Sequence, residues 1–416
     1  MKKKIQALQR KGVRIPAPDS VEIGNEVPLE RISGDGVVIH AGCKIYGSET
    51  LVLDGAKLGY EGPVTVENCC IGPDVQLKAG FFKEAVFLQK VIMGFGAHVR
   101  EGCILEEESN AAHTVALKQT ILFPFVTLGS LINFCDCLMA GGTSRRNHSE
   151  VGSSYIHFNY TPNQDKATPS LIGDVPRGVM LNQRPIFLGG QGGLVGPSRL
   201  AFGTLIAAGS IYRKDELIPD RLVFEGTPKA GRVPFHPGLY RTVKRTFLNN
   251  VEYISNLMAL MQWYRNVRRQ FISPDFPQPL YDGLVRNLDR AIAERIGRLG
   301  DFCHKMEASA HIYRRVANPD PSSLLLTQKQ ELAERWPAIE DVLKRGAGRG
   351  GGSDLRDRFL ERLQGSIDAA GRDYIAAVQS LSREQSSLGT AWLQGIAERI
   401  RDAVFAIVPS LAQRTK

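Results

Sequence analysis

The stretch LGGQGGLVGPSRLAFGTLIAAGS, residues 188–210, decides the fold. Its aliphatic residues recur at every sixth position: Leu188, Leu194, Leu200 and Ile206. A step of six fits neither an α-helix, with 3.6 residues per turn, nor an isolated strand with alternating side chains. It is typical of a hexapeptide solenoid, in which each hexad forms one short strand and three hexads complete a coil of roughly 18 residues.

The same step occurs through the first half of the chain. It relates Ile39 to Ile45 and Leu51, Met93 to Val99 and Leu105, and Val126 to Ile132 and Leu138. We therefore expect a left-handed parallel β-helix, a β-solenoid, over residues 33–228, with a separate N-terminal segment at 1–32. The step is interrupted near residues 81–92, 106–120 and 140–147, where we expect loops to leave the coil.

A second region follows a proline-rich boundary at residues 228–237. Beyond it, hydrophobic residues keep the 3–4 spacing of helices, and we expect an all-α region over residues 238–416. Residues 1–230 contain 24 Lys and Arg against 23 Asp and Glu, whereas the remainder contains 28 against 20. The helical region is therefore basic, but we interpret this charge as a solvated helix surface and do not expect nucleic-acid binding.

Other sequence features exclude several classes of protein. No apolar run approaches 18 residues, so we expect no membrane span. The start, MKKKIQALQRKG, lacks the apolar core of a secretory signal. The seven cysteines include no CxxC pair, and no His-x₄-His occurs, so we expect reduced cysteines, no metal and a cytoplasmic location.

The segment NHSEVGSSYIHFNYTPNQDKATPSLIGD, residues 147–174, holds more polar residues than a structural coil requires. From Glu150 onward it resembles the acetyltransferase half of the bifunctional glucosamine-1-phosphate acetyltransferase/N-acetylglucosamine-1-phosphate uridyltransferase. The resemblance covers about residues 35–228 and continues through the stretch 188–210. It implies a homotrimer that uses acetyl-CoA to acylate an amino-sugar phosphate or a nucleotide amino-sugar related to UDP-N-acetylglucosamine. No glycine-rich nucleotide loop precedes the hexads, so we do not expect uridyltransferase activity.

The resemblance also suggests site residues. Those expected at the cofactor are Asn159, Tyr160, Lys166, Gly190 and Ala208. Gly190 stands where the family usually has serine. On the sugar side, Arg100 resembles the arginine that grips the sugar phosphate, and Glu150 replaces an asparagine. Arg145 and Arg146 offer further cations for a phosphate.

The catalytic base has three candidates. Forming an amide from a thioester requires a base near neutral pH, which suits histidine. The family's histidine lies about four hexads before the Asn-Tyr pair, and that count lands near Asp136, where there is no histidine. His148 is 11 residues before Asn159, so it can serve only if the loop AGGTSRRN re-aims it, and His157 is the third candidate.

An alternative keeps the fold without the reaction. Because the expected histidine is missing, the chain could be a non-catalytic β-helix that binds a nucleotide sugar or a protein partner. Binding of acetyl-CoA distinguishes the two functions.

Overall fold

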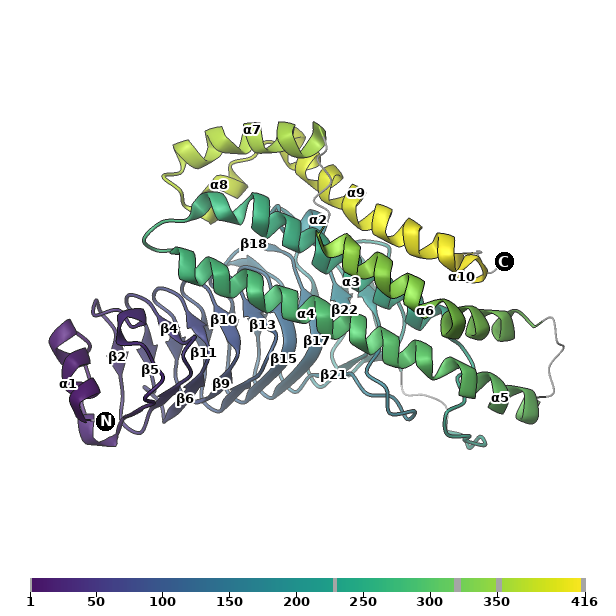
Figure 1. The fold of residues 1–416 in the computed structure, drawn as a ribbon, viewed down its shortest axis with the longest axis horizontal. Coiled ribbons are helices and arrows are strands. Elements are labelled where there is room, and N and C mark those ends of the chain that lie inside the picture. The colour runs from purple at the N-terminus through teal and green to yellow at the C-terminus, as the bar shows by residue number, and fades with distance from the viewer. Residues whose placement is uncertain (1, 227–229, 318–322, 349–353, 413–416) are drawn as a thin grey trace.

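A computed structural model describes residues 2–226, 230–317, 323–348 and 354–412. The first part is a parallel β-solenoid and the second is a layer of helices that runs along it (Figure 1). Each complete coil has three strands, so the solenoid has three faces. We number the faces 1, 2 and 3 in chain order and name each corner by the two faces it joins.

The strands fall into these faces as follows. Face 1 is a sheet of ten strands: β2 (Val38–Ile39), β5 (Lys57–Leu58), β8 (Gln76–Leu77), β11 (Ile92–Met93), β14 (Asn110–Ala111), β16 (Thr127–Leu128), β20 (Glu150–Val151), β23 (Phe187–Leu188), β26 (Leu205–Ile206) and β28 (Leu222–Val223). Face 2 contains β1 (Glu22–Ile23), β3 (Lys44–Tyr46), β6 (Val64–Glu67), β9 (Gly80–Lys83), β12 (Ala97–Val99), β21 (Ile156–Phe158), β24 (Gly193–Val195) and β27 (Ile211–Tyr212). Face 3 contains β4 (Leu51–Val52), β7 (Cys70–Ile71), β10 (Ala85–Phe87), β13 (Cys103–Leu105), β22 (Ser170–Ile172) and β25 (Arg199–Leu200). Two long strands, β15 (Val115–Leu122) and β17 (Ile132–Met139), turn corner 2–3 and belong to faces 2 and 3.

The solenoid core is a stack of apolar side chains in register. On face 1, for example, Leu188 pairs with Val151 on one side and Ile206 on the other, and all three are buried. Each side chain therefore packs on its counterpart in the neighbouring coil, which explains why small irregularities in the six-residue step are tolerated. The β-solenoid followed by helices is confirmed.

Face 3 is apolar on its outer side as well. Its outward row consists of Leu51, Cys70, Val86, Ile104, Ile121, Leu138 and Leu171, which pair in register and are all buried. Helix α4 (Gln278–His304) packs on β7, β10 and β13, and α3 (Lys244–Asn266) packs on β22. The helices therefore bury a second hydrophobic layer outside the solenoid.

The remaining helices build outward from this layer. They are α5 (Met306–Ala317), α6 (Leu324–Gly348), α7 (Asp354–Ala369), α8 (Tyr374–Gln379), α9 (Arg383–Ile407) and α10 (Pro409–Ala412), with a 3₁₀ turn, η3, at Arg268–Phe271. Helix α3 packs against both α4 and α9, so most of its surface is buried. Among the described residues, no helix has the length and apolar character needed to span a bilayer.

The N-terminal segment is part of the solenoid, unlike the separate segment expected at 1–32. Helix α1 (Lys2–Lys11) buries Ile5 and Leu8, and 3₁₀ turns lie at Pro18–Ser20 and Leu29–Arg31. The Nζ atom of Lys4 donates to the carbonyl oxygens of Gly24, Asn25 and Val27. The helix therefore caps the first coil and β1 already pairs with β3.

Two of the three expected loops are absent. Residues 81–92 and 106–120 stay in the coil, and the step is broken there because some coils are shorter than 18 residues. Val66, for example, pairs with Phe82 in the next coil, 16 residues on. Of the three segments where loops were expected, only residues 140–147 leave the coil. They form the hairpin of β18 (Gly142–Ser144) and β19 (Asn147–His148) at corner 3–1. Two excursions were not expected: the loop 159–169 at corner 2–3, and residues 173–186, with α2 (Val175–Gly178), at corner 3–1.

Candidate functional site

The loop 159–169 leaves the coil between β21 and β22 and carries three predicted site residues. Tyr160 is exposed, whereas Asn159 and Lys166 are half-buried. The loop interrupts a strand pair that continues directly from face 2 to face 3 in β15 and β17. It therefore presents polar side chains at corner 2–3, where the preceding coils turn within one or a few residues.

The helical region holds this loop by several hydrogen bonds. Asn163 Oδ1 accepts from the backbone N–H of Gly238 at 3.0 Å, and Tyr240 Oη donates to Asp165 Oδ2 at 2.8 Å. From α3, Asn250 Nδ2 donates to the carbonyl oxygen of Ala167 at 2.9 Å. Lys305 Nζ donates to the carbonyl oxygens of Asn163 and Gln164. The loop conformation thus depends on residues more than 70 positions away in the sequence.

Asp136 lies beside Asn159, as the count from the Asn-Tyr pair predicts. Asn159 Nδ2 donates to Asp136 Oδ2 at 3.0 Å, and Asp136 Oδ1 lies 2.9 Å from Arg295 Nη2 on α4. The side chains of Asp136 and Arg295 are only 4% and 2% exposed. Arg295 therefore engages one oxygen of the buried Asp136 carboxylate and Asn159 engages the other, so neither oxygen is free to act as a base.

Arg100 occupies the same corner farther along the solenoid. It follows β12, and three coil-to-coil steps separate β12 from β21 through β15 and β17. At about 4.8 Å per step, Arg100 and Asn159 are about 14 Å apart along the solenoid axis. Arg100 Nε lies 3.5 Å from Glu101, which also pairs with Lys118 at 2.7 Å.

His157 lies inside the solenoid core. It occupies the inward position of face 2 and pairs in register with Leu194. Its Nδ1 lies 2.6 Å from the carbonyl oxygen of Cys135, and its Nε2 lies 2.7 Å from Ser170 Oγ. Because both ring nitrogens are engaged and the residue is only 2% exposed, His157 is a structural histidine in this conformation.

The hairpin at corner 3–1 carries His148. His148 Nδ1 lies 2.9 Å from the carbonyl oxygen of Arg145, and Nε2 lies 3.6 Å from Glu150 Oε2. The Nη1 atom of Arg145 donates to Glu108 O, Phe125 O and Thr127 Oγ1. The Arg145 guanidinium therefore fixes the hairpin to the solenoid, whereas Arg146 is exposed.

The predicted residues consequently lie at three corners of one coil stack. Asn159 is at corner 2–3 and His148 at corner 3–1, while Gly190 and Ala208 are at corner 1–2, where a Cβ on Gly189 would touch Ala208. The conformation of residues 140–147 does not direct the His148 side chain toward Asn159 of the same chain. Within one copy, Asp136 and Asn159 are in contact at corner 2–3, and His148, Arg145 and Glu150 are in contact at corner 3–1, but the two groups remain apart.

The comparisons with known proteins match the solenoid. No protein-family profile matches the chain. The bifunctional protein GlmU of Pelobacter propionicus is 28% identical over 227 residues, which are 54% of this chain and 44% of that protein. GlmU of Thermotoga petrophila is 27% identical over 214 residues, 51% of this chain and 42% of that protein. The matched part of GlmU is its acetyltransferase region. The chain resembles the hexapeptide-repeat acyltransferases.

The chain spans less than half the length of these GlmU relatives. A crystal structure of the polysialic acid O-acetyltransferase OatWY covers 54% of this chain and 92% of its own, with 12% identity. Its TM-score of 0.18 is too low to support a structural inference.

Arg295 is the residue at this corner that the sequence did not reveal. It lies on a predicted amphipathic helix, where arginines are ordinary, and the sequence shows no link between it and Asp136. Two further arginines of α4 also pair with acidic residues near corner 2–3: Arg286 with Glu49 at 2.5 Å and Arg290 with Glu84 at 3.5 Å. Part of the positive charge of the helical region therefore docks α4 on the solenoid.

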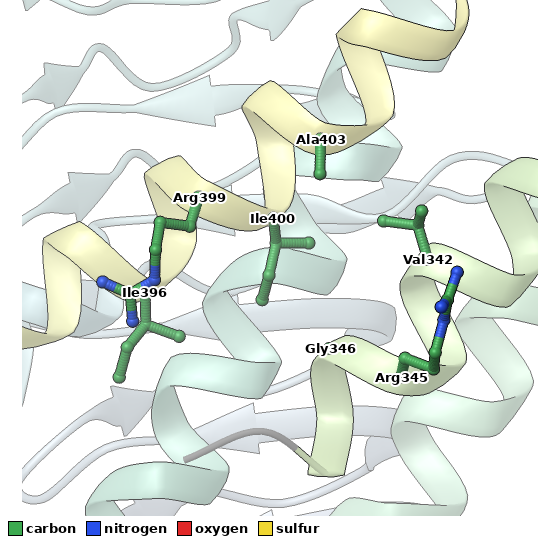
Figure 2. A pocket seen from close by; sticks show the side chains of 7 residues that line it. All are labelled: Val342, Arg345, Gly346, Ile396, Arg399, Ile400 and Ala403. Carbon is green, nitrogen blue, oxygen red and sulfur yellow. The ribbon is translucent and has the colours of Figure 1, made fainter. Parts of the chain in front are cut away.

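One cavity is lined by the helical region alone. It has a volume of about 270 Å³ and lies between α6 and α9. In Figure 2, Ile400 lies between Arg399 on α9 and Arg345 on α6. None of its lining residues belongs to the predicted site. Among the described residues, no group of three or more His, Cys, Asp and Glu side chains could hold a metal ion.

Proposed function

We propose that the solenoid transfers an acyl group, acetyl in the simplest case, from acyl-CoA to the amine of an amino-sugar phosphate or a nucleotide amino-sugar. The observation that carries this proposal is the loop 159–169, which presents the exposed Tyr160 and the half-buried Asn159 and Lys166 within the region similar to GlmU. Lys166 would pair with a phosphate of CoA.

The reaction needs a base and an electrophile. The amine nitrogen attacks the thioester carbonyl, a C–N bond replaces the C–S bond, and the base takes the amine proton and passes it to the departing CoA thiolate, which leaves as the free thiol. We assign the base to His148. Its Nδ1 proton donates to the carbonyl oxygen of Arg145, so the Nε2 lone pair is the proton acceptor, and Glu150 at 3.6 Å would stabilise the imidazolium.

The site would form between copies of the chain. Face 3 is covered by its own helices, so faces 1 and 2 remain for association. Both carry exposed apolar side chains in the coils around the candidate site: Phe187, Leu205 and Leu222 on face 1, and Ile156 and Phe158 on face 2. Packing face 1 of one copy against face 2 of the next is a heterologous contact that can close into a ring of three.

Such a ring would bring His148 and Asn159 together. With corner 1–2 of every copy near the threefold axis, corner 3–1 of one copy faces corner 2–3 of its neighbour. Rotation about an axis parallel to the solenoid leaves each coil at the same height, and His148 and Asn159 flank strands β20 and β21 of one coil. His148 of one copy would then face Asn159 of the next, with Arg146 and Arg100 available for the acceptor phosphate.

The test is turnover with acetyl-CoA and a panel of amines, followed by the release of free thiol. We expect amino-sugars that carry phosphate or nucleotide to be preferred over neutral amines, and the opposite preference would refute the acceptor class. Light scattering should give three chains per particle, and a monomer at micromolar concentration would contradict the composite site. The seven free cysteines suit a reducing compartment, and we place the reaction in the cytoplasm.

A second function has one observation in its favour. Asp136, at the place where the resemblance expects a histidine, is neutralised by Arg295. This arrangement also suits a solenoid that binds a nucleotide sugar or a protein partner without reaction. Acetyl-CoA binding with turnover excludes this alternative, and the absence of both supports it.

A further inference from the structure

Helix α4 lies along corner 2–3 and forms three ion pairs with the solenoid, which differ in their exposure to water. The side chains of Arg286, Glu49, Arg290 and Glu84 are all between 30% and 50% exposed, so water screens their two pairs. The pair of Arg295 with Asp136 is shielded from water. The first two pairs therefore dock the helix, whereas the third acts within the candidate site.

The buried pair determines the orientation of Asn159 through the Asp136 carboxylate. A carboxylate paired with a guanidinium accepts hydrogen bonds and donates none. The Asn159 amide must then direct its Nδ2 protons to Asp136 Oδ2, where the distance is 3.0 Å. Its carbonyl oxygen, Oδ1, has no hydrogen-bond partner among the described residues.

Arg295 also contacts the loop itself. Its Nη1 donates to the carbonyl oxygen of Lys166 at 3.4 Å. One buried side chain of the helical region thus reaches both Asp136 and the backbone of the loop that carries Tyr160 and Lys166. Deleting its charge would free the Asn159 amide to rotate.

We propose that Arg295 is a positioning residue that makes Asn159 an obligate hydrogen-bond acceptor, so that this corner selects a ligand that offers an N–H group. The inference rests on the proposed function for the identity of the ligand. Two sources of the N–H group fit: an amide of the pantetheine arm of CoA and the amine of the acceptor. An anionic oxygen would be repelled by Asn159 Oδ1 in this orientation.

The experiment compares binding of CoA with that of two analogues in which one pantetheine amide N–H is replaced by an ester oxygen. The wild type should bind one analogue about tenfold more weakly, since it leaves one hydrogen bond unmade. Arg295→Met should bind CoA more weakly and lose this discrimination, and Arg295→Lys should recover part of it. Arg290→Met, the matched control on the same helix edge, should behave as the wild type.

The possible outcomes of this experiment distinguish the two sources of the N–H group. If both analogues bind like CoA while an acceptor with a hydroxyl in place of its amine binds about tenfold more weakly, the N–H group comes from the acceptor. If Arg295→Met keeps the wild-type discrimination against the analogue or the hydroxyl acceptor, or if the wild type discriminates against neither, the inference is wrong.

Crystal structures test the positioning role of Arg295 even if the proposed function is wrong. If the wild type neither binds CoA nor turns over, the proposed function fails and the positioning role is judged by the crystal structures of both proteins. We expect Asn159 Nδ2 to stay on Asp136 in the wild type and in Arg290→Met, and to leave it in Arg295→Met. An unchanged Asn159 in folded Arg295→Met would overturn the positioning role.

Discussion

The Nε2 atom of His157 lies 2.7 Å from Ser170 Oγ within the core of the solenoid. In the neighbouring coils the same inward position holds Phe134 and Leu194, so the histidine replaces an apolar side chain in the stack. Burial lowers the pKa of His157 from 6.5 to about 4. The neutral imidazole can satisfy both of its contacts, but an imidazolium would be a buried charge.

This buried histidine predicts a pH dependence of stability. The unfolded chain binds a proton at His157 near pH 6.5 and the folded chain only near pH 4, so stability falls as the pH drops between these values. The full loss is about 3 kcal/mol for a shift of this size. In His157→Gln the slope of unfolding free energy between pH 6.5 and 4 should flatten, measured by chemical denaturation. An unchanged slope would show that other groups dominate.

Glu106 should act in the opposite direction. Burial and then the neighbouring Glu107 carboxylate raise the pKa of Glu106 to about 7, although Arg268 opposes this. The folded chain therefore keeps a proton that the unfolded chain releases near pH 4.5, and stability falls as the pH rises from 4.5 to 7.

Glu106→Gln isolates this effect because the amide oxygen can still accept from Tyr264 Oη. Relative to the wild type, the variant should gain stability as the pH increases from 4.5 to 8. A gain that does not vary with pH would show that Glu106 is not titrating in this range. His157 and Glu106 change the unfolding free energy with pH in opposite directions, so their effects partly cancel in the wild type. Comparing Glu106→Gln with His157→Gln separates the two contributions.

Docking of α4 depends on a glycine. A Cβ atom on Gly283 would lie 2.4 Å from Cys70 Sγ, and Cys70 belongs to a strand that is paired on both sides. Gly283→Ala should lower the unfolding free energy by about 1–3 kcal/mol. Gly297→Ala on the same helix meets nothing within 4 Å and should raise it by up to about 1 kcal/mol. Adding Cys70→Ala should rescue Gly283→Ala, and failure of the rescue would place the clash elsewhere.

The composite site predicts complementation between defective chains. His148→Ala should lower kcat by roughly 10²–10⁴ with little change in acetyl-CoA affinity, whereas Asn159→Ala should weaken the cofactor. Trimers assembled from both variants should regain about one quarter of the wild-type sites, because each site takes one residue from each neighbour. If activity returns in no mixture, the two residues do not share a site across copies.

The single variants also test the choice of base. Full activity of His148→Ala together with an inactive Asp136→Ala or His157→Ala would show that the base is misassigned. Equal trace turnover in all three would indicate a binding surface that has the fold without the reaction.

The sequence was sufficient to predict the solenoid because its signal is local and repeated. The hexads from Leu188 to Ile206 have the correct phase, and each fills the core as expected. The six-residue step wrongly placed Leu51 and Leu138 in the core. Both face outward, and Val52 and Met139 fill the core instead. On face 3, two consecutive apolar residues occur in most coils, and this doubling was the available sign that another layer covers that face.

The candidate site was predictable only in part. The count from Asn159 landed near Asp136, which lies one coil earlier and 23 residues back, because the hairpin at residues 140–147 lengthens that coil. It could not show that Arg295 would neutralise the carboxylate, that His157 would point inward, or that Arg145 would bind backbone carbonyls. The outcomes at His157 and Arg145 depend on the direction of single side chains, and the outcome at Asp136 depends on a contact with a residue more than 100 positions away.

The sequence by itself thus determined the repeated backbone, since each hexad supplies its own apolar residue for the core and that residue packs on its counterparts in the neighbouring coils. Only the tertiary structure decided which faces remain free and which charges are paired. Burial of the apolar outer row of face 3 required a helix about 200 residues away, and that helix brought Arg295 to Asp136. No local pattern encodes such a pair, because its stability comes from the exclusion of water by the assembled layers.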